Sequence, residues 1–328
     1  MPSWKSASRT SASTRASRRH PVSAAAAQAT SRRPPPRVWV LAARPATLPA
    51  AIVPVIVGTA AGTAPLGAQA INPRTFVLAL LTALLIQIGT NFANDVFDFR
   101  RGADTLDRLG PLRVSQAGLI SPRQVLTATY LTFGLAALIG AYLVVTGGGA
   151  FILAIGAASI LAGLAYTGGP WPIGYHALGD LFVFIFFGLL AVVGSAYLQI
   201  PTVTALDLWA AVPVGCLVTA ILVVNNLRDV QTDRGVGKRT LAVVVGRRNT
   251  RLEYLLLVLV AYVVPLLLWR AGLLGNFFWL PWLSAPLGFW LVRYVFRAEG
   301  RPLNMALKRT GQLHLVFGVL FALALWLG

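Results

Sequence analysis

The sequence predicts an all-α integral membrane protein with about nine transmembrane helices. Of its 328 residues, 56% are hydrophobic and 12% are charged, and the mean hydropathy is +0.70. Apolar runs long enough to cross a hydrocarbon core of about 30 Å recur from about residue 45 to the end of the chain. These runs are continuous and do not alternate with polar residues, which disfavours a β-barrel.

The expected spans follow one another along the chain, and polar residues separate most of them. Several contain Gly or Pro, which packed membrane helices tolerate. Only Gly147, Gly148 and Gly149 interrupt the apolar run from 123 to 167, so the count is nine, give or take one. In chain order the spans are 46–64, 75–94, 123–145, 149–167, 179–199, 208–226, 252–271, 277–296 and 311–327.

The basic residues predict the orientation of these spans. The net charge is +18, and 26 of the 28 Lys and Arg residues lie in positions 1–44 or beside the loops after the second, sixth and eighth spans. Only Arg74 and Arg270 lie on the other side. Because cytoplasmic loops are enriched in Lys and Arg, the amino terminus and the even-numbered loops are expected in the cytoplasm. The charge thus reflects topology, and we expect no nucleic-acid partner.

Residues 1–40 are predicted to be a disordered basic tail, and residues 41–328 the transmembrane domain. Positions 1–37 are rich in Ser, Arg and Ala, contain no acidic residue and end after a run of three prolines. This composition suits an organellar transit peptide as well as a tail on an anionic membrane, and we favour the tail. Cys216 is the only cysteine, so the chain has no internal disulfide.

The acidic residues are unusually placed. Six of the ten fall in two short segments, which end the second and sixth spans. Carboxylates at a membrane boundary are costly, so two clusters of them indicate a cation site. The equivalent positions of the segments suggest an internal repeat of about four helices, which would bring both to one face. The six residues are Asp95, Asp98, Asp104, Asp107, Asp229 and Asp233.

Helical spacing places the polar residues of each segment on one stripe. Asn91, Asn94, Asp95 and Asp98 stand at i, i+3, i+4 and i+7, and Asn225 or Asn226 with Asp229 and Asp233 repeats the pattern. Mg²⁺ usually combines one or two carboxylates with waters and phosphate oxygens. Two facing stripes would therefore suit two Mg²⁺ ions that share a diphosphate. Basic residues on the same loops would balance the remaining negative charge: Arg113, Arg228, Lys238 and Arg239.

These motifs resemble those of a known family. The pattern Asn-Asp-x-x-Asp, followed by Asp-x-x-x-Asp in a nine-helix chain, is similar to the UbiA superfamily of intramembrane aromatic prenyltransferases. The resemblance covers about residues 40–327 and implies the helical bundle of that family. Four stretches resemble the menaquinone-pathway branch, which prenylates 1,4-dihydroxy-2-naphthoate: 44–50, 102–119, 166–170, and 225–229 with 237–241.

The resemblance implies Mg²⁺-dependent transfer of a polyprenyl group from polyprenyl diphosphate to 1,4-dihydroxy-2-naphthoate, with loss of CO₂. The site would lie at the cytoplasmic face of a bacterial plasma membrane. Two Mg²⁺ ions would bridge the diphosphate, held by Asp95, Asp98, Asp229 and Asp233.

Further roles follow from the same resemblance. Arg44 would meet the carboxylate of the aromatic acid, or else be a snorkelling anchor, and Tyr166 would lie near the allylic carbon, or else in an interfacial belt. Asp104 and Asp107 are candidate bases for the phenolic proton, although Gly102 stands where the family often has another Asp. The remaining substrate-binding candidates are Asn91, Arg113, Asn226, Arg228, Lys238 and Arg239.

Two alternatives stay open. A related enzyme could act on another aromatic acceptor such as 4-hydroxybenzoate or homogentisate, which the loop at 110–113 disfavours. A cation transporter would place its carboxylates in the middle of the spans, whereas these lie at span ends beside basic loops. Trp171 and Tyr175 are near the depth at which aromatic faces could shield an allylic cation. Asp180 begins the fifth span, where we expect it to cap the helix.

Overall fold

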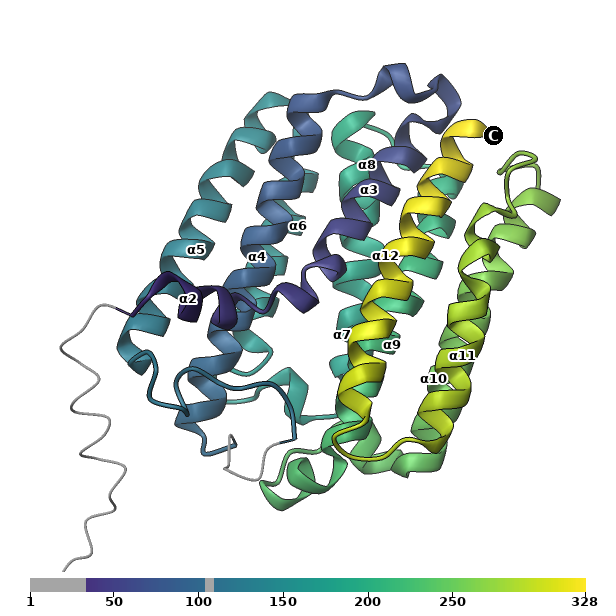
Figure 1. Cartoon of the computed structure of the whole chain (residues 1–328). Coiled ribbons are helices and arrows are strands. Elements are labelled where there is room, and N and C mark those ends of the chain that lie inside the picture. The colour runs from purple at the N-terminus through teal and green to yellow at the C-terminus, as the bar shows by residue number, and fades with distance from the viewer. Residues whose placement is uncertain (1–33, 104–108) are drawn as a thin grey trace, which may run out of the picture.

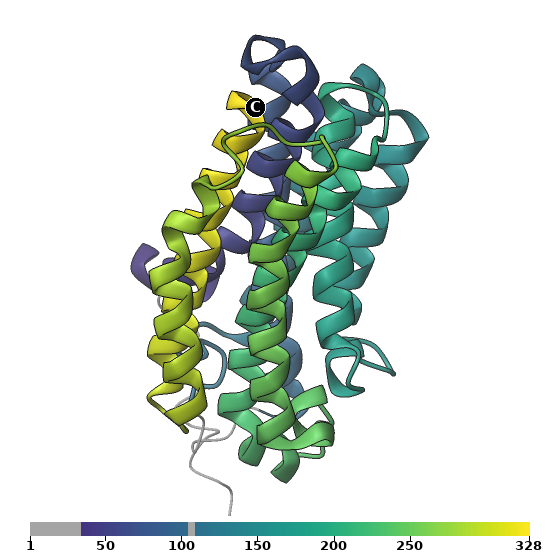
Figure 2. The same cartoon turned by 90° about the vertical axis from the view of Figure 1, so that its right-hand side faces the viewer.

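The chain folds into a bundle of long helices. The computed structural model describes residues 34–103 and 109–328, and no strand occurs within these two ranges. In the views of Figures 1 and 2 the long helices run roughly side by side, as expected of a membrane bundle. The predicted boundary at residue 40 falls inside the first helix, α2, and residues 1–33 lie outside the described residues, so the division into tail and domain stays a prediction.

The amino-terminal half of the bundle starts with α2 and a short 3-10 turn, η2, beside the first long helices. Its elements are α2 (Pro36–Ala43), η2 (Pro45–Thr47), α3 (Pro49–Thr63), η3 (Ala64–Leu66), η4 (Ala68–Ala70), α4 (Pro73–Arg100), α5 (Pro122–Leu143), η5 (Val144–Gly148) and α6 (Gly149–Ala165). Their starts follow local rules. Asn72 caps α4 through the backbone N–H of Thr75, and Ser121 forms a capping box with Gln124 at the start of α5.

The carboxyl-terminal half contains the longest helices. Its elements are η6 (Ile173–Tyr175), α7 (Gly179–Val183), η7 (Phe184–Leu190), α8 (Ala191–Gln199), α9 (Ala205–Gly235), α10 (Leu241–Arg270), η8 (Leu280–Ser284), α11 (Ala285–Arg297) and α12 (Leu303–Leu327). The segments α7, η7 and α8 are continuous. Helix α10 is broken near its start, where Gly246 has a φ of 79°.

The structure is compatible with the nine predicted crossings. Seven helical segments in the described part are long and apolar enough to span a membrane. One of them, Pro122–Ala165, contains two predicted spans, which meet where Gly147 has a φ of 147° and the helix turns back. The predicted span 277–296 is represented by η8 and α11, which together run from Leu280 to Arg297.

Helix α9 is the centre of the bundle. Within its most apolar 18-residue stretch, 72% of the residues are buried. In the corresponding stretch of Pro122–Ala165, at the edge of the bundle, only 17% are buried. Helix α9 packs against α10, α12 and α3, and α4 packs against α5. Because α9 carries the second acidic segment, its central place leads that segment into the middle of one end of the bundle.

Small residues allow the closest helix contacts. A Cβ atom added to Gly58 of α3 would overlap the carbonyl oxygen of Val192 and lie 2.7 Å from the Cβ of Ser195 on α8. Likewise, a Cβ atom on Gly188 would lie 2.6 Å from the Cα of Gly215 on α9. Such contacts bring backbones together where lipid supplies no hydrophobic drive for helix association.

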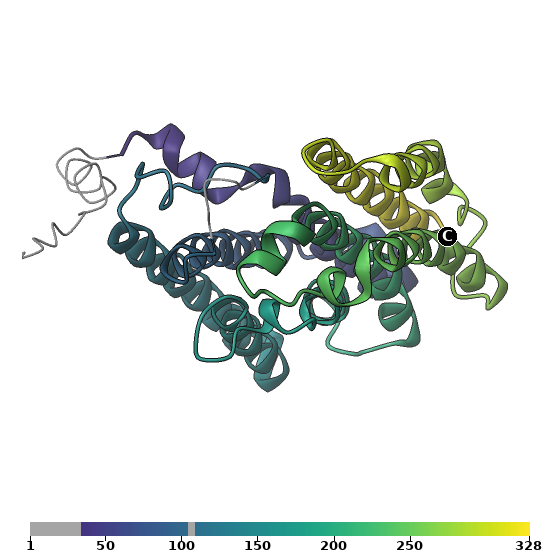
Figure 3. The same cartoon turned by 90° about the horizontal axis from the view of Figure 1, so that it is seen from below.

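The loops after α4, α6 and α9 lie at the same end of the bundle, opposite the carboxyl terminus (Figure 1). Figure 3 looks onto this end, where the segment that follows α9 lies across the middle of the bundle. Both acidic segments therefore reach one face, as the internal repeat predicted.

We predict that Gly58→Val destabilises the bundle, because the added side chain would meet the backbone of α8. Overpacking of this kind costs about 1–3 kcal/mol, occasionally more. Thermal unfolding in detergent should show a clear decrease in Tm. The matched control is Gly134→Val on α5, where a Cβ atom would meet nothing within 4 Å. Equal Tm values for the two variants would contradict this packing.

Candidate functional site

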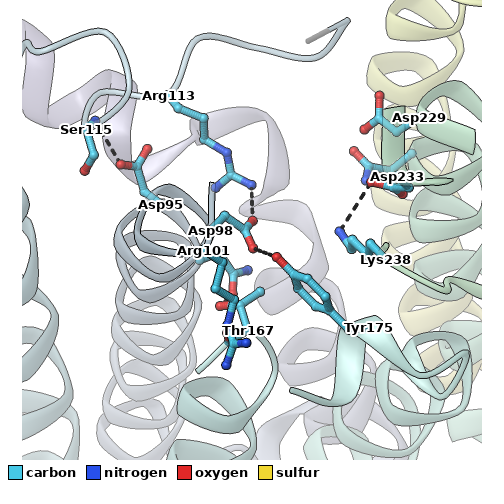
Figure 4. Close-up of polar contacts among 12 residues, drawn as sticks. Asp95, Asp98, Arg101, Arg113, Ser115, Thr167, Tyr175, Asp229, Asp233 and Lys238 are labelled. Carbon is cyan, nitrogen blue, oxygen red and sulfur yellow. Dashed lines mark hydrogen bonds and ion pairs between the residues drawn. The ribbon is translucent and has the colours of Figure 1, made fainter. Parts of the chain in front are cut away.

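The first carboxylate pair organises the loop that follows α4. Asp95 accepts hydrogen bonds from the backbone N–H groups of Val114 and Ser115, both at 3.0 Å. Asp98 pairs with Arg113 at 2.8 Å, and these two side chains are only 5% and 6% exposed. Figure 4 shows the loop folded back over the end of α4 through these contacts. Because the acids are satisfied by the loop, they fix its position as well as their own.

Asn91, one turn before Asp95, holds the segment that carries Arg44. Its Nδ2 atom donates to the carbonyl oxygen of Ala43 at 2.9 Å and to Oγ1 of Thr47 at 3.0 Å. Arg44 itself has a left-handed backbone, with a φ of 53°, and is partly buried. The structure thus fixes the residues on both sides of Arg44 to α4 one helical turn before Asp95, although Arg44 and Asp95 are about fifty residues apart in the sequence.

The second carboxylate pair ends α9. Both oxygens of Asp229 accept from the guanidinium of Arg228, at 2.8 Å and 2.6 Å, and both residues are buried. Asp233 lies 3.8 Å from the Nζ atom of Lys238, whose backbone N–H donates to the carbonyl oxygen of Asp233 at 2.9 Å. The second pair is thus held by cations from its own helix and from the loop that follows.

The other basic and amide candidates differ in their surroundings. Arg228 also donates to Asn225 and Asn304, each at 2.8 Å. Its predicted contact with a diphosphate stays a prediction. Asn226 is buried and stands three residues before Asp229 on α9. Arg239 is exposed on the loop, where its backbone N–H donates to the carbonyl oxygen of Tyr175 at 3.1 Å.

Tyr175 joins the two carboxylate pairs. Its hydroxyl donates to Oδ1 of Asp98 at 2.9 Å, and the Nζ atom of Lys238 lies 5.3 Å from the centre of its ring. The guanidinium of Arg101 lies 5.6 Å from the same centre. Figure 4 shows this side chain in the interval between the two pairs, which face one another. We infer a cation–π contact from each basic group, so Tyr175 helps to set the spacing of the pairs.

Asn304 makes a second link, which the sequence did not suggest. Its Oδ1 accepts from Nη1 of Arg228 at 2.8 Å, and its Nδ2 donates to the carbonyl oxygen of Leu109 at 2.9 Å. Asn304 therefore connects the second acidic segment to the loop that covers the first. Its place in the first turn of α12 follows no acidic motif, and nothing in its local spacing marks it.

Tyr166 lies at the end of α6, against two glycines. Its carbonyl accepts from the N–H of Gly174 at 2.9 Å, and a Cβ atom on Gly179 would stand 2.9 Å from its hydroxyl. Burial, followed by the nearby Asp180, Asp98 and Asp233 carboxylates, raises the pKa of Tyr166, so its phenol stays protonated. Asp104 and Asp107, the candidate bases, lie outside the described residues.

The donor set fits Mg²⁺ bound together with a diphosphate. Among the described residues, no three Asp, Glu, His or Cys side chains come together as a complete metal site. Each pair instead offers two carboxylates, the oxygen donors that Mg²⁺ prefers, and their existing contacts would hold them in orientation. Mg²⁺ commonly uses one or two carboxylates and takes its other ligands from phosphate and water.

Comparison with known proteins shows which sequences this chain resembles. A model described as the UbiA prenyltransferase family matches residues 51–316. The chain is 40% identical over 299 residues to a 1,4-dihydroxy-2-naphthoate octaprenyltransferase of Escherichia coli (strain K12), with 89% of this chain and 96% of the relative covered. The enzyme of the same name from Mycobacterium tuberculosis is 40% identical over 296 residues, with 88% and 97% covered.

The fold also resembles that of solved structures of UbiA homologs. A solved structure described as a UbiA homolog from Archaeoglobus fulgidus bound to DMAPP and Mg²⁺ matches with a TM-score of 0.63, covering 88% of this chain and 98% of that one. Its sequence is 16% identical, so the likeness concerns the fold.

We predict that Asn304→Leu lowers the Tm in detergent, because it leaves a buried Arg228 donor and the Leu109 carbonyl without their partner. An unsatisfied buried group costs about 1–3 kcal/mol. Asn304→Asp, which keeps an acceptor for Arg228 but loses the donor to Leu109, should be affected less. The control is Asn249→Leu, an exposed asparagine that bonds within α10. Equal effects at positions 249 and 304 would contradict the link.

Proposed function

We propose that this chain, which belongs to the UbiA prenyltransferase family, transfers a polyprenyl group from a polyprenyl diphosphate to 1,4-dihydroxy-2-naphthoate. Loss of CO₂ would then give demethylmenaquinol. The activity is supported by identities of 35–40% to relatives with this activity in their names, over about 89% of this chain. The observation that carries the proposal is that both carboxylate pairs face one another at one end of an apolar bundle.

The protein is a multi-pass membrane protein, and the orientation is part of the proposal. All basic loops beside the site are on the side that the positive-inside rule assigns to the cytoplasm. We therefore place the site at the cytoplasmic face of a bacterial plasma membrane. A water-soluble diphosphate head and an acidic aromatic acceptor would both reach the site from this face.

Asp95, Asp98, Asp229 and Asp233 would hold two Mg²⁺ ions on either side of the diphosphate. When bound, the ions would neutralise the charge that develops on the leaving diphosphate. Binding of Mg²⁺ and DMAPP by the family's Archaeoglobus fulgidus member supports a metal-dependent site of this kind. Lys238 and Arg113 lie beside the carboxylates, and Arg239 follows Lys238 on the same loop; all three would supply further positive charge.

Two tyrosines and Arg44 would bind the allylic cation and the aromatic acceptor. The rings of Tyr175 and Tyr166 border the interval next to the carboxylate pairs, and their faces would stabilise an allylic cation. Arg44, held close by through Asn91, would bind the carboxylate of the aromatic acid. The loops folded over α4 and α9 would keep water from the cation, which would otherwise be hydrolysed.

The buried polar residues would act as supports. Arg228 would hold Asp229 in one orientation through its two-fold contact, and Asn226 would line the site beside it. Asp104 and Asp107 stay candidates for a base that removes the phenolic proton.

We predict that membranes containing this protein prenylate 1,4-dihydroxy-2-naphthoate only in the presence of Mg²⁺. Asp95→Asn and Asp229→Asn should each lower kcat/KM by a factor on the order of 10² or more, because each removes a charged ligand at the diphosphate. The control is Asp207→Asn, a buried carboxylate in the first turn of α9, at the far end of that helix. Full activity in the presence of a chelator, or full activity of Asp95→Asn or Asp229→Asn, would contradict the two-metal proposal.

We also predict that the acceptor is selective. In parallel assays with one allylic diphosphate, 4-hydroxybenzoate and homogentisate should give no more than trace product, detected by mass. The stretches at 102–119 and 166–170 support this choice because they resemble the menaquinone-pathway branch. Preferred use of 4-hydroxybenzoate would assign the chain to a different branch of the family.

A further inference from the structure

Asp180 carries a buried carboxylate that has no hydrogen-bond partner on any other described residue. The residue is 6% exposed, and neither of its carboxylate oxygens accepts a hydrogen bond from another residue in the ranges 34–103 and 109–328. The predicted capping role is wrong, since Leu178 occupies the N-cap of α7 and no side chain caps that helix. By contrast, all four carboxylates of the two acidic motifs have hydrogen-bonded or charged partners.

A buried carboxylate without a hydrogen-bond partner lowers the stability of the fold. Buried polar groups in proteins are almost always hydrogen-bonded, and a buried charge without a partner is strongly destabilising. Each of the other buried acids among the described residues has at least one hydrogen bond or ion pair. Asp207, for example, completes a capping box with Thr204 at the start of α9. Asp180 therefore points to a partner that arrives with a ligand.

Asp180 lies where the acceptor would react. The preceding residue, Gly179, packs closely against Tyr166 and Leu222. A Cβ atom at position 179 would lie 2.9 Å from the Tyr166 hydroxyl oxygen and 3.5 Å from Cδ2 of Leu222. Leu222 precedes Asp229 by two helical turns, which is about 10 Å along α9. Asp180 therefore lies deeper in the bundle than Asp229, on the side away from the proposed diphosphate. It also lies beside Tyr166, the tyrosine proposed to stand near the allylic carbon.

The chemistry of the reactants selects one class of ligand. An ionised diphosphate offers only acceptor oxygens and would repel a carboxylate, and an isoprenoid chain has no polar group. The aromatic diol has two ring hydroxyls, which are hydrogen-bond donors. We infer that Asp180 binds the aromatic acceptor by accepting a hydrogen bond from one of its ring hydroxyls, an inference that rests on the proposed function.

This contact would orient the ring and favour its attack. A hydrogen bond to a carboxylate is charge-assisted and about twice as strong as a neutral one. It would also increase the electron density of the ring while the hydroxyl keeps its proton. With Arg44 on the acid's carboxylate, Asp180 would give the acceptor a second fixed point, so that the reacting carbon faces the prenyl group.

The test separates acceptor binding from diphosphate binding. Asp180→Leu should raise the KM for 1,4-dihydroxy-2-naphthoate about 10- to 100-fold, as expected for a lost bond to a charged group, and leave the KM for the allylic diphosphate within about twofold. Asp180→Asn, which keeps one acceptor oxygen and nearly the same size, should show a smaller increase. Both variants are compared with Asp207→Asn, and their Tm values establish that they fold.

Two acceptor analogues make the test specific. 1-Hydroxy-2-naphthoate and 4-hydroxy-2-naphthoate each lack one ring hydroxyl, and their inhibition constants can be measured as inhibition of 1,4-dihydroxy-2-naphthoate prenylation. Asp180→Leu should weaken only the analogue that retains the bound hydroxyl. Equal weakening of both analogues, or an unchanged acceptor KM in Asp180→Leu and Asp180→Asn, would overturn the inference. A wild-type protein that does not prenylate 1,4-dihydroxy-2-naphthoate would instead contradict the proposed function.

Discussion

Each carboxylate at the end of an apolar helix must find a partner, and the site is built from those partners. Asp95 draws the loop after α4 onto the helix through two backbone N–H groups, and Asp98 holds Arg113. Asp229 pairs with Arg228 of its own helix, and Asp233 pairs with Lys238 of the short connection after α9. The desolvation cost of the first two acids thus explains why the polar loop after α4 folds back over the bundle instead of extending into solvent.

The two halves of the site are held together by neutral side chains. Tyr175 contacts Asp98 through its hydroxyl and Lys238 through its ring, and Asn304 joins Arg228 to the loop at Leu109. Such links suit a site that takes up a highly charged ligand, because a neutral bridge keeps its geometry when the surrounding charges are rebalanced. They also connect α12 to a reaction for which it supplies no acidic or basic motif.

Among the buried acids of the described residues, Asp180 is the one whose two oxygens both lack a hydrogen-bond partner, and its position suggests a reason. It lies next to Tyr166, deeper in the bundle than the four carboxylates proposed to hold metal and diphosphate. In the proposed function, the two acidic motifs would form a region for metal and diphosphate, and Asp180 would belong to a region for the aromatic acceptor. This division agrees with the order of groups in the proposed reaction.

The sequence alone determined the features that depend on local pattern. Continuous apolar runs predicted the spans, the bias of Lys and Arg predicted their orientation, and the spacing of three and four residues placed Asp95 with Asp98, and Asp229 with Asp233, on single helix faces. Only the tertiary structure decided which distant groups meet. Tyr175 reaches Asp98 across 77 residues and Asn304 reaches Arg228 across 76, while the carboxylate of Asp180 accepts no hydrogen bond from any other described residue. These contacts depend on which helices lie side by side and how deeply each one sits, and the periodicity of a single helix carries no information about either.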